Sequence, residues 1–360
     1  MKMIIQRMHL TVYLMREMRT TMKARNAYVK LKYKGNGTMD ITEESSGCSI
    51  VDCASGEADT ISVSLCNRNG KWFKKNYFPK SSDYIKATIV TEKWNGDNEQ
   101  KVQAYQGKFV ADQIVSSGFS STVDLEGISI PLHTGFNVTQ RNRTYKKTSL
   151  KSILMTIANR ADITLVFEAS NHKIDEVGQD GNTDLEFAFS LCSDYGCCMK
   201  LYNGKMIIYD QTKYERKASR FTLKKAEIGD DSAFSFTRSI SKVYDSVKFQ
   251  YQNKKGKNIT YNYHIPGRTA KRTLFISSSA DSHADAEKKA KAQLASALRE
   301  AVTASFTLMG NPRYKACTVF RVSGFGEFDG RYFIDKATHN FSDDGYTSSI
   351  ECHKCVTNIV

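Results

Sequence analysis

Thr60-Ile61-Ser62-Val63-Ser64-Leu65 alternates hydroxyl and apolar side chains residue by residue. A period of two is typical of an antiparallel β-strand that buries one face and exposes the other. Similar segments lie on both sides, separated by turns rich in Gly and Asn, at residues 28–33, 84–92 and 102–114. Strands at this spacing, with few helical patterns between them, predict a small barrel or sandwich in the first third of the chain.

The pattern changes after about residue 132. Ser149 stands where it can cap a helix that starts at Leu150, and Thr183 with Glu186 forms a capping-box pattern. The segments 197–202 and 205–210 flank Asn203-Gly204, which is a strong signal for a β-hairpin. This middle block is therefore expected to be a small α+β unit.

Strand character returns from about residue 221. The segments 242–253 and 258–265 are expected to pair as a hairpin, and a helix is expected over residues 282–302. Its inner stripe is predicted to hold Ala290, Leu294, Ala297 and Ala301. Three further strands are expected at 318–322, 331–336 and 347–352.

The predicted fold class is thus mainly β (α+β), with a small α+β insert between two antiparallel β-barrels. The predicted parts are an N-terminal extension at 1–21, a first β-barrel at 22–132, the α+β domain at 133–212, and a second β-barrel at 213–360 that includes the helix 282–302. Arg7 and His9 interrupt the apolar run of the extension, which disfavours a signal peptide. We interpret the extension as the product of an upstream start codon or as a loose basic helix.

The chain has 360 residues and a formal net charge of +14. Its aromatic content of 11% argues against global disorder, and no stretch approaches the roughly 20 apolar residues that a membrane helix needs. Two segments, 1–34 and 238–272, each hold nine basic residues and one acidic residue, so the rest of the chain is nearly neutral. The second segment supplies a candidate basic contact strip, formed by Lys248, Lys254, Lys255, Lys257, Arg268, Lys271 and Arg272.

Tyrosines interleave with these lysines, and such a mixture can bind single-stranded nucleic acid by stacking and charge. The alternative is a two-stranded ribbon whose tyrosines pack inward and whose lysines are solvated. The sequence favours the ribbon.

Catalytic signatures are absent from the sequence, which contains no G-x-S-x-G, H-E-x-x-H or G-x-x-x-x-G-K-[ST] motif. The nine cysteines are irregularly spaced and are expected to be reduced; Cys352 and Cys355 are expected at a strand end and not in a zinc site. His339 and His353 are expected to be structural. We therefore predict no enzyme activity, no catalytic or metal-binding residues and no cofactor.

The order of these parts resembles the baseplate hub proteins of contractile phage tails and tailocins, a family that includes the phage late control protein D and is related to the hub part of type VI secretion spike proteins. The resemblance covers about Met22 to the C-terminus. It is carried by the segments 56–72, 106–112, 147–161 and 184–200, and by C-terminal turns around 310–312, 325–334 and 345–347. The structural turn motif consists of Gly310, Pro312, Gly326, Gly330, Tyr332 and Gly345.

The resemblance implies a structural protein of a contractile injection system. It implies a homotrimer in which two tube-like barrels per chain form a pseudo-hexameric ring, joining a sixfold inner tail tube protein to a threefold central spike protein and lining the channel. Other baseplate proteins, and DNA passing through the channel, are further implied partners. Such a protein assembles in the bacterial cytoplasm and becomes part of a virion tail or a released tail-like particle.

Two alternatives remain open at this point. A tail-associated cell-wall hydrolase would need a carboxylate or Cys/His site that the sequence does not reveal. A basic nucleic-acid-binding protein would use the strip within residues 242–272.

Overall fold

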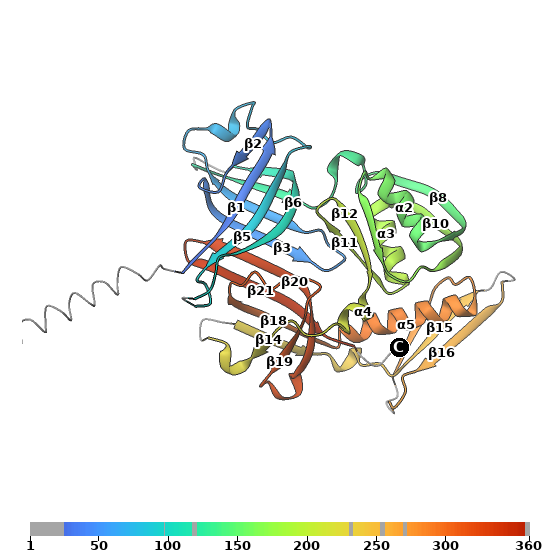
Figure 1. Ribbon diagram of the computed structural model, residues 1–360. Coiled ribbons are helices and arrows are strands. Elements are labelled where there is room, and N and C mark those ends of the chain that lie inside the picture. The colour runs from blue at the N-terminus through green and yellow to red at the C-terminus, as the bar shows by residue number, and fades with distance from the viewer. Residues whose placement is uncertain are drawn as a thin grey trace, which may run out of the picture.

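The computed structural model describes residues 25–96, 98–116, 121–229, 233–252, 256–268 and 272–356. The extension predicted at residues 1–21 lies outside the described residues. The described chain is mainly β, with large antiparallel sheets and few helices, which confirms the predicted fold class. Figure 1 shows two curled sheets on one side of the molecule and two smaller units that contain the helices on the other.

The first barrel is an antiparallel sheet that curls around one apolar core. The strands predicted at 60–65, 84–92 and 102–114 are confirmed, and Trp72, from the short helix η1 (Lys71–Phe73), is fully buried in the same core. Alternate side chains along each strand face inward, as Ile61, Val63 and Leu65 show with at most 1% exposure. The strands of this sheet are β1 (Asn26–Gly35), β2 (Gly37–Asp40), β3 (Ser45–Cys53), β4 (Thr60–Cys66), β5 (Tyr84–Glu92), β6 (Val102–Val115) and β7 (Thr122–Ile128).

The second barrel has its own core, in which aromatic side chains such as Phe306, Phe320 and Tyr332 are at most 1% exposed. The three C-terminal strands predicted from the sequence are confirmed: the first is shifted by one residue, and the other two are longer than predicted. Its strands are β13 (Thr222–Lys224), β14 (Ala233–Arg238), β18 (Val302–Met309), β19 (Val319–Ser323), β20 (Gly330–Ser342) and β21 (Gly345–Lys354). The short helices η3 (Lys225–Glu227), η4 (Ile240–Lys242) and η5 (Gly326–Phe328) lie in its connections.

The two barrels share one 13-stranded sheet. The second half of β20 pairs with β3, from Lys336 opposite Cys53 to Phe341 opposite Cys48. The main path of the sheet has the order β14-β18-β21-β20-β3-β4-β7-β6-β5-β1-β2, and β19 and β13 branch from β20 to complete the 13 strands.

The middle block folds as the expected α+β insert, with a core shared by two helices and a three-stranded sheet. Ser149 caps α2 and Thr183 caps α3 in a complete capping box with Glu186, as predicted. The sequence did not reveal the long two-stranded sheet of β8 and β10, because these strands are polar and lack an alternating pattern. The elements are η2 (Leu132–Thr134), β8 (Gln140–Ser149), α2 (Leu150–Arg160), β9 (Thr164–Glu168), β10 (Lys173–Thr183), α3 (Asp184–Asp194), β11 (Cys197–Tyr202), β12 (Lys205–Asp210) and α4 (Gln211–Glu215).

The predicted hairpin and the Ala-rich helix form a fourth unit, here called the ribbon unit. It consists of β15 (Ser246–Gln252), β16 (Asn258–His264), β17 (Thr273–Ser277) and α5 (His283–Arg299), and α5 packs on β15 and β16 (Figure 1). The predicted inner stripe of α5 was partly wrong. Its buried face holds Ala286, Ala290, Leu294 and Leu298, whereas Ala297 is half-buried and Ala301 follows the helix.

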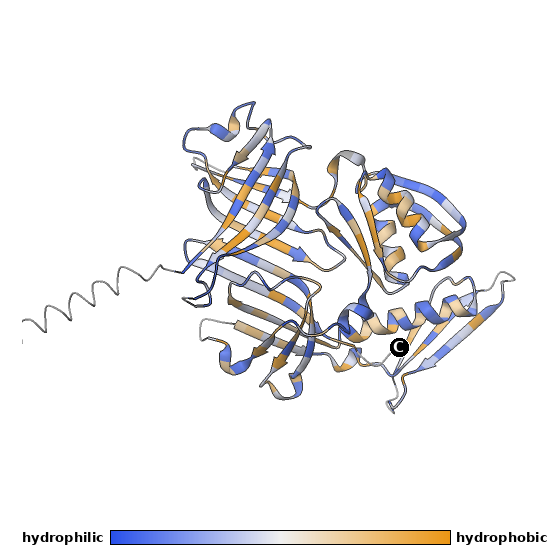
Figure 2. Cartoon of the chain, viewed as in Figure 1, coloured by the Kyte–Doolittle hydropathy of each residue, from blue (hydrophilic) through white to orange (hydrophobic). Residues whose placement is uncertain are grey.

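Figure 2 shows apolar residues along the strands of both curled sheets and along α5. These residues pack into the cores of the two barrels and of the ribbon unit. Each unit thus has a core of its own, and contacts at the junctions determine how the units are held together. The domain boundaries at residues 132 and 212 stay a prediction.

Candidate functional site

The predicted basic strip is divided between two places in the ribbon unit. Lys248 lies on the face of the ribbon that points away from α5, and its Nζ is 5.8 Å from the ring centre of Phe275, which is 71% exposed. Lys257 precedes β16, in the same unit. Lys254, Lys255 and Lys271 lie outside the described residues.

The two arginines of the strip lie at the base of the ribbon unit, where it meets the second barrel. Arg268 donates to the carbonyl oxygen of Tyr244 at 2.8 Å, and Arg272 donates to the carbonyl oxygens of Ile240 and Ser241 at 3.3 and 2.9 Å. Asp245 accepts the backbone N–H of Arg272. These arginines therefore hold connecting segments in place.

The tyrosines of the ribbon face the helix and not the lysine side. Tyr251 and Tyr261 are buried against α5, and Tyr263 packs on the same core. The side of the ribbon that carries Lys248 has Phe275 as its exposed aromatic ring among the described residues. The arrangement matches the ribbon alternative better than a row of stacking platforms for bases.

Part of the structural turn motif lies where the two barrels meet. Gly310 follows β18, its N–H donates to the carbonyl oxygen of Tyr346 at 2.9 Å, and a Cβ built on it would lie 2.3 Å from Tyr346 Cγ. Only glycine allows this close approach of backbone and ring. Pro312 is buried in the next turn, and Gly345, with φ of 114°, forms the β20–β21 hairpin turn that presents Tyr346.

The Tyr346 side chain joins the two barrels. It starts from β21 of the second barrel but belongs to the apolar core of the first, where its ring stacks on Phe341 with centroids 4.1 Å apart and lies 5.6 Å from Trp94. Its hydroxyl lies 2.8 Å from His339 Nδ1, and Ser348 Oγ lies 2.9 Å from the same nitrogen. Burial lowers the pKa of His339 to about 4, so the ring is neutral at physiological pH. His339 is structural here, as expected.

The rest of the turn motif shapes the β19–β20 connection. Asp329 accepts the backbone N–H groups of Gly324 and Phe325 at 3.1 and 2.7 Å, and the Tyr332 hydroxyl donates to the carbonyl oxygen of Phe328 at 2.7 Å. Gly326 and Gly330 both have positive φ, at 64° and 146°. The turn is therefore an ordinary structural turn between two strands.

A buried ion network that the sequence analysis missed joins the insert to both barrels. Lys200 of β11 donates to Asp52 at 2.6 Å and to Asp59 at 2.8 Å, and Asp52 also accepts the backbone N–H of Ala316 at 2.9 Å. Burial raises the pKa of Asp59 to about 7, and the Lys200 ammonium opposes this rise. The sequence held one signal for this network: Lys200 is the single charged residue in the otherwise apolar segment 197–202.

A second missed network joins α4, α5 and the second barrel. Glu215 is fully buried, accepts from Arg299 at 2.5 Å and lies 3.3 Å from His353 Nε2, while His353 Nδ1 lies 2.7 Å from Asp335. Burial would lower the pKa of His353, but the charges and hydrogen bonds of Asp335 and Glu215 together outweigh it and raise this pKa. Burial would raise the pKa of Glu215, but contacts with His353 and Arg299 together outweigh it and lower this pKa. The charged forms of His353 and Glu215 are thereby favoured, which is a structural use of an imidazole.

The described part of the chain contains no group of three or more His, Cys, Asp or Glu side chains placed to hold a metal ion. All nine cysteines are free, and Cys352 and Cys355 lie at the end of β21 as expected. None of the helices in the described residues is long and apolar enough to span a membrane.

Solved structures with the same fold include phage tail proteins and a type VI secretion component. The tail protein of Neisseria meningitidis MC58 aligns with a TM-score of 0.65 and 16% identity over 91% of this chain and 97% of its own. The 43-kDa tail protein of prophage MuSo2 from Shewanella oneidensis aligns with a TM-score of 0.65 and 14% identity over 91% and 98%. The c3393 protein of Escherichia coli, described as a type VI secretion component similar to the T4 tail proteins gp27 and gp5, aligns with a TM-score of 0.52 and 11% identity over 93% and 75%.

These alignments define the class: the chain has the fold of phage tail proteins, as the sequence resemblance implied, and these neighbours are tail or secretion-system proteins. Within this class, the family model described as YQBQ-like matches residues 138–353, and the chain belongs to the YQBQ-like family. A search of curated proteins found no match.

Proposed function

We propose that this chain is a structural hub of a phage tail or tail-like baseplate. Three copies form a ring that joins the sixfold inner tube to the threefold central spike. The similarity to phage tail proteins along nearly the whole chain supports a tail role. The more specific role in the hub depends on the architecture of the chain.

The observation that carries this proposal is the single sheet running through two barrels. Three chains with two barrels each would present six similar barrels to a sixfold tube. The same ring contains three identical chains, so it would also match the threefold symmetry of a spike. Among the described residues, β14 and β2 end the main path of the sheet with one strand partner each, and β13 ends its branch in the same way. Open edges of this kind can continue a sheet into a neighbouring chain, and a head-to-tail contact closes into a ring.

The β14 edge also carries an apolar side chain that suits a contact between copies. Phe234 is 46% exposed, and its ring lies 5.0 Å from that of Phe325 behind it. We assign the start of the β14 edge, at Phe234, to the interface between copies.

The junction contacts support the same proposal, because a ring needs a fixed angle between its two barrels. Tyr346, the Lys200 network and the Glu215 network hold the barrels and the insert to one another through buried groups. The partners would be the tube protein, the spike protein and other baseplate proteins, with DNA passing through the channel where the particle carries it. The chain would assemble in the bacterial cytoplasm and remain in a virion tail or in a headless particle such as a tailocin.

Sedimentation at micromolar concentration tests the proposal, with a trimer as the expected species. Phe234→Lys places a charge on the β14 edge and is expected to give monomers with an unchanged circular dichroism spectrum. Phe275→Lys is the matched control, since it makes the same change at a more exposed phenylalanine on the ribbon, and should leave the trimer intact. A monomeric wild-type chain that does not assemble when tube or spike protein is added would contradict the proposal.

A further inference from the structure

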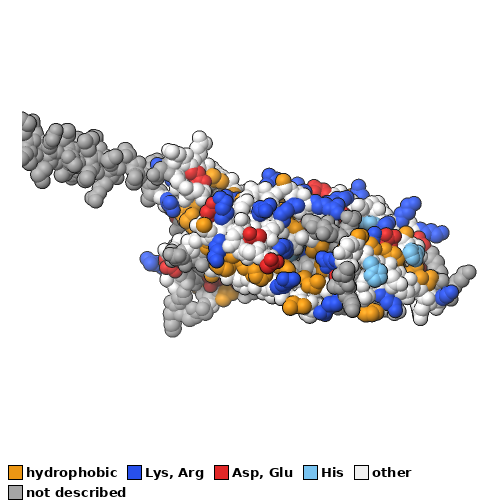
Figure 3. Space-filling model, turned by 90° about the horizontal axis from the view of Figure 1, so that it is seen from below, with side chains coloured by type: hydrophobic (Ala, Val, Ile, Leu, Met, Phe, Trp, Pro, Cys, Tyr) orange, Lys and Arg blue, Asp and Glu red, His pale blue; other side chains and the backbone are white. Residues whose placement is uncertain are grey.

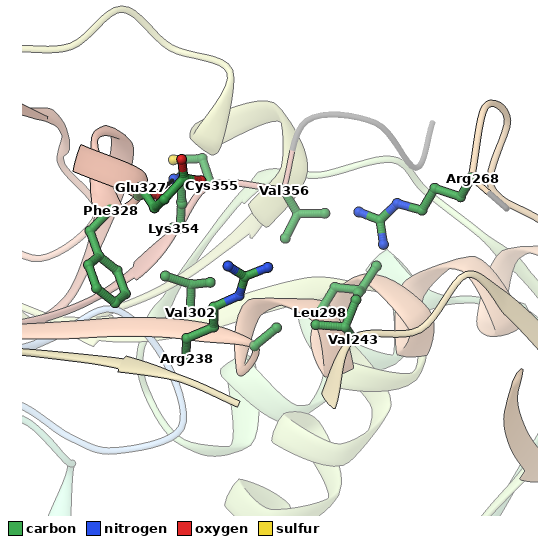
Figure 4. Close-up of a pocket in the computed structure, with 11 residues that line it drawn as sticks. Arg238, Val243, Arg268, Leu298, Val302, Glu327, Phe328, Lys354, Cys355 and Val356 are labelled. Carbon is green, nitrogen blue, oxygen red and sulfur yellow. Dashed lines mark hydrogen bonds between the residues drawn. The ribbon is translucent and has the colours of Figure 1, made fainter. Parts of the chain in front are cut away.

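A groove of about 440 Å³ lies between the second barrel and the ribbon unit. Its walls come from β14, the end of α5, the β19–β20 turn and the chain after β21, as Figure 4 shows. This volume falls in the range of about 300–1,000 Å³ typical of ligand pockets. None of the functions discussed so far uses it.

Three basic side chains from different elements enter the groove. Arg238 of β14 has no hydrogen bond or ion pair from its guanidinium among the described residues, and Figure 4 shows it and Arg268 pointing into the groove from opposite sides. Arg268 is partly compensated by the carbonyl of Tyr244 and by Asp245, whose Oδ1 is 3.9 Å away. Lys354 donates to the carbonyl oxygen of Glu327 at 3.1 Å.

Positive charge therefore exceeds negative charge in the groove, because Glu327 is the one carboxylate among its described lining residues. Lys and Arg are also more widespread than Asp and Glu on the face of the molecule shown in Figure 3. An anionic group would gain a charge-assisted hydrogen bond from Arg238, whose guanidinium has no partner to give up within the described part of the chain.

The remaining lining is apolar. Val243, Leu298, Val302, Phe328 and Val356 form the walls between the cations. A ligand that fills this groove must thus combine an anionic group with an aliphatic or aromatic group a short distance away.

We propose that the groove binds an acidic peptide segment of a partner protein, with a carboxylate at Arg238 and Arg268 and an apolar side chain on Leu298 and Val302. A nucleic acid fits less well, because its phosphates would leave the apolar walls of the groove uncovered. The binding does not depend on the hub role, so its failure would leave the proposed ring untouched.

Fluorescence anisotropy with a labelled Asp-Leu-Asp-Ile peptide, at physiological salt and with the full chain, tests this inference. Binding is expected in the micromolar range and should be lost with an Asn-Leu-Asn-Ile peptide, which lacks the acidic side chains, and with Asp-Ser-Asp-Ser, which lacks the apolar ones. Binding of the asparagine peptide as tight as that of the acidic one would overturn the proposal. So would a labelled ten-thymidine oligonucleotide that binds more tightly and displaces the peptide.

Variants locate the site. Arg238→Gln is expected to weaken peptide binding about tenfold, because it removes a charged hydrogen-bond donor. Glu327→Gln should tighten binding several-fold by removing the carboxylate. Arg143→Gln, the matched control, removes an exposed arginine from β8 of the insert and should leave binding unchanged. Equal weakening by Arg238→Gln and Arg143→Gln would show a response to net charge alone and would refute the site.

Discussion

Replacing Gly310 by alanine should disrupt the contact between the two barrels. The added Cβ would lie 2.3–2.4 Å from three atoms of the Tyr346 ring, well inside van der Waals contact. The ring has little room to retreat, because it stacks on Phe341 and its hydroxyl is 2.8 Å from His339 Nδ1. Forcing an extra carbon into a packed site costs about 1–3 kcal/mol, and losing the hydrogen bond adds about 1 kcal/mol.

We therefore expect Gly310→Ala to lower the free energy of unfolding by about 3 kcal/mol, measured by urea titration followed by tryptophan fluorescence. Gly96→Ala is the matched control, because it lies in the neighbouring loop and a Cβ there has no atom within 4 Å. Surface substitutions of this kind usually change stability by less than about 0.5 kcal/mol.

A double-mutant cycle isolates the contact. In a Tyr346→Ala background the obstacle is gone, so Gly310→Ala should cost about 1 kcal/mol or less. If Gly310→Ala cost as little as Gly96→Ala, or cost the same in both backgrounds, the reasoning that Tyr346 requires a glycine at 310 would be refuted.

Three further results are expected. Folding keeps His339 neutral with a pKa of about 4, below the value near 6.5 of an unfolded histidine, so stability is complete above pH 7 and is lost as the pH falls. From pH 7 to pH 5 the wild type should lose about 2 kcal/mol relative to His339→Gln, and parallel pH curves would contradict this. Lys200→Met leaves Asp52 and Asp59 without their cation and should lower the free energy of unfolding by about 3–5 kcal/mol. Lys205→Met, an exposed control on β12, should leave that free energy nearly unchanged. Equal losses in the two variants would show that the Lys200 network does not stabilise the fold. Burial raises the pKa of Cys48, Cys317 and Cys355 to about 12, whereas Cys66 is exposed. A thiol reagent should therefore label Cys66 first. A fast phase of labelling that survives the Cys66→Ser substitution would disprove that order.

Local patterns in the sequence were sufficient to predict most of the elements. Alternation in 60–65 and 84–92 predicted β4 and β5, and the caps at Ser149 and Thr183 predicted where α2 and α3 begin. These features are local, since a strand face or a cap is defined by residues within a few positions.

Features that depend on distant residues could not be predicted. The pairing of β3 with β20 joins segments almost 290 residues apart, and the sequence of neither strand indicates with which strand it pairs. The polar strands β8 and β10 are stabilised by pairing with each other, so neither carries an amphipathic signal. Lys200 was readable as an unusual charge in an apolar strand, but its partners Asp52 and Asp59 became evident only in three dimensions.

The basic strip shows the same limitation. The sequence grouped seven basic residues by their positions along the chain, whereas the structure places Lys248 on an open face and Arg268 and Arg272 among backbone carbonyls. Arg238, which lay outside the predicted strip, is the groove cation that has no partner among the described residues.

Electron microscopy of the purified chain tests the central claim most directly. The account predicts ring-shaped particles with threefold symmetry, in which each copy contributes two similar lobes to one face so that six surround a central channel. Single compact particles, or twofold dimers without a channel, would contradict the assignment of this chain as a trimeric hub.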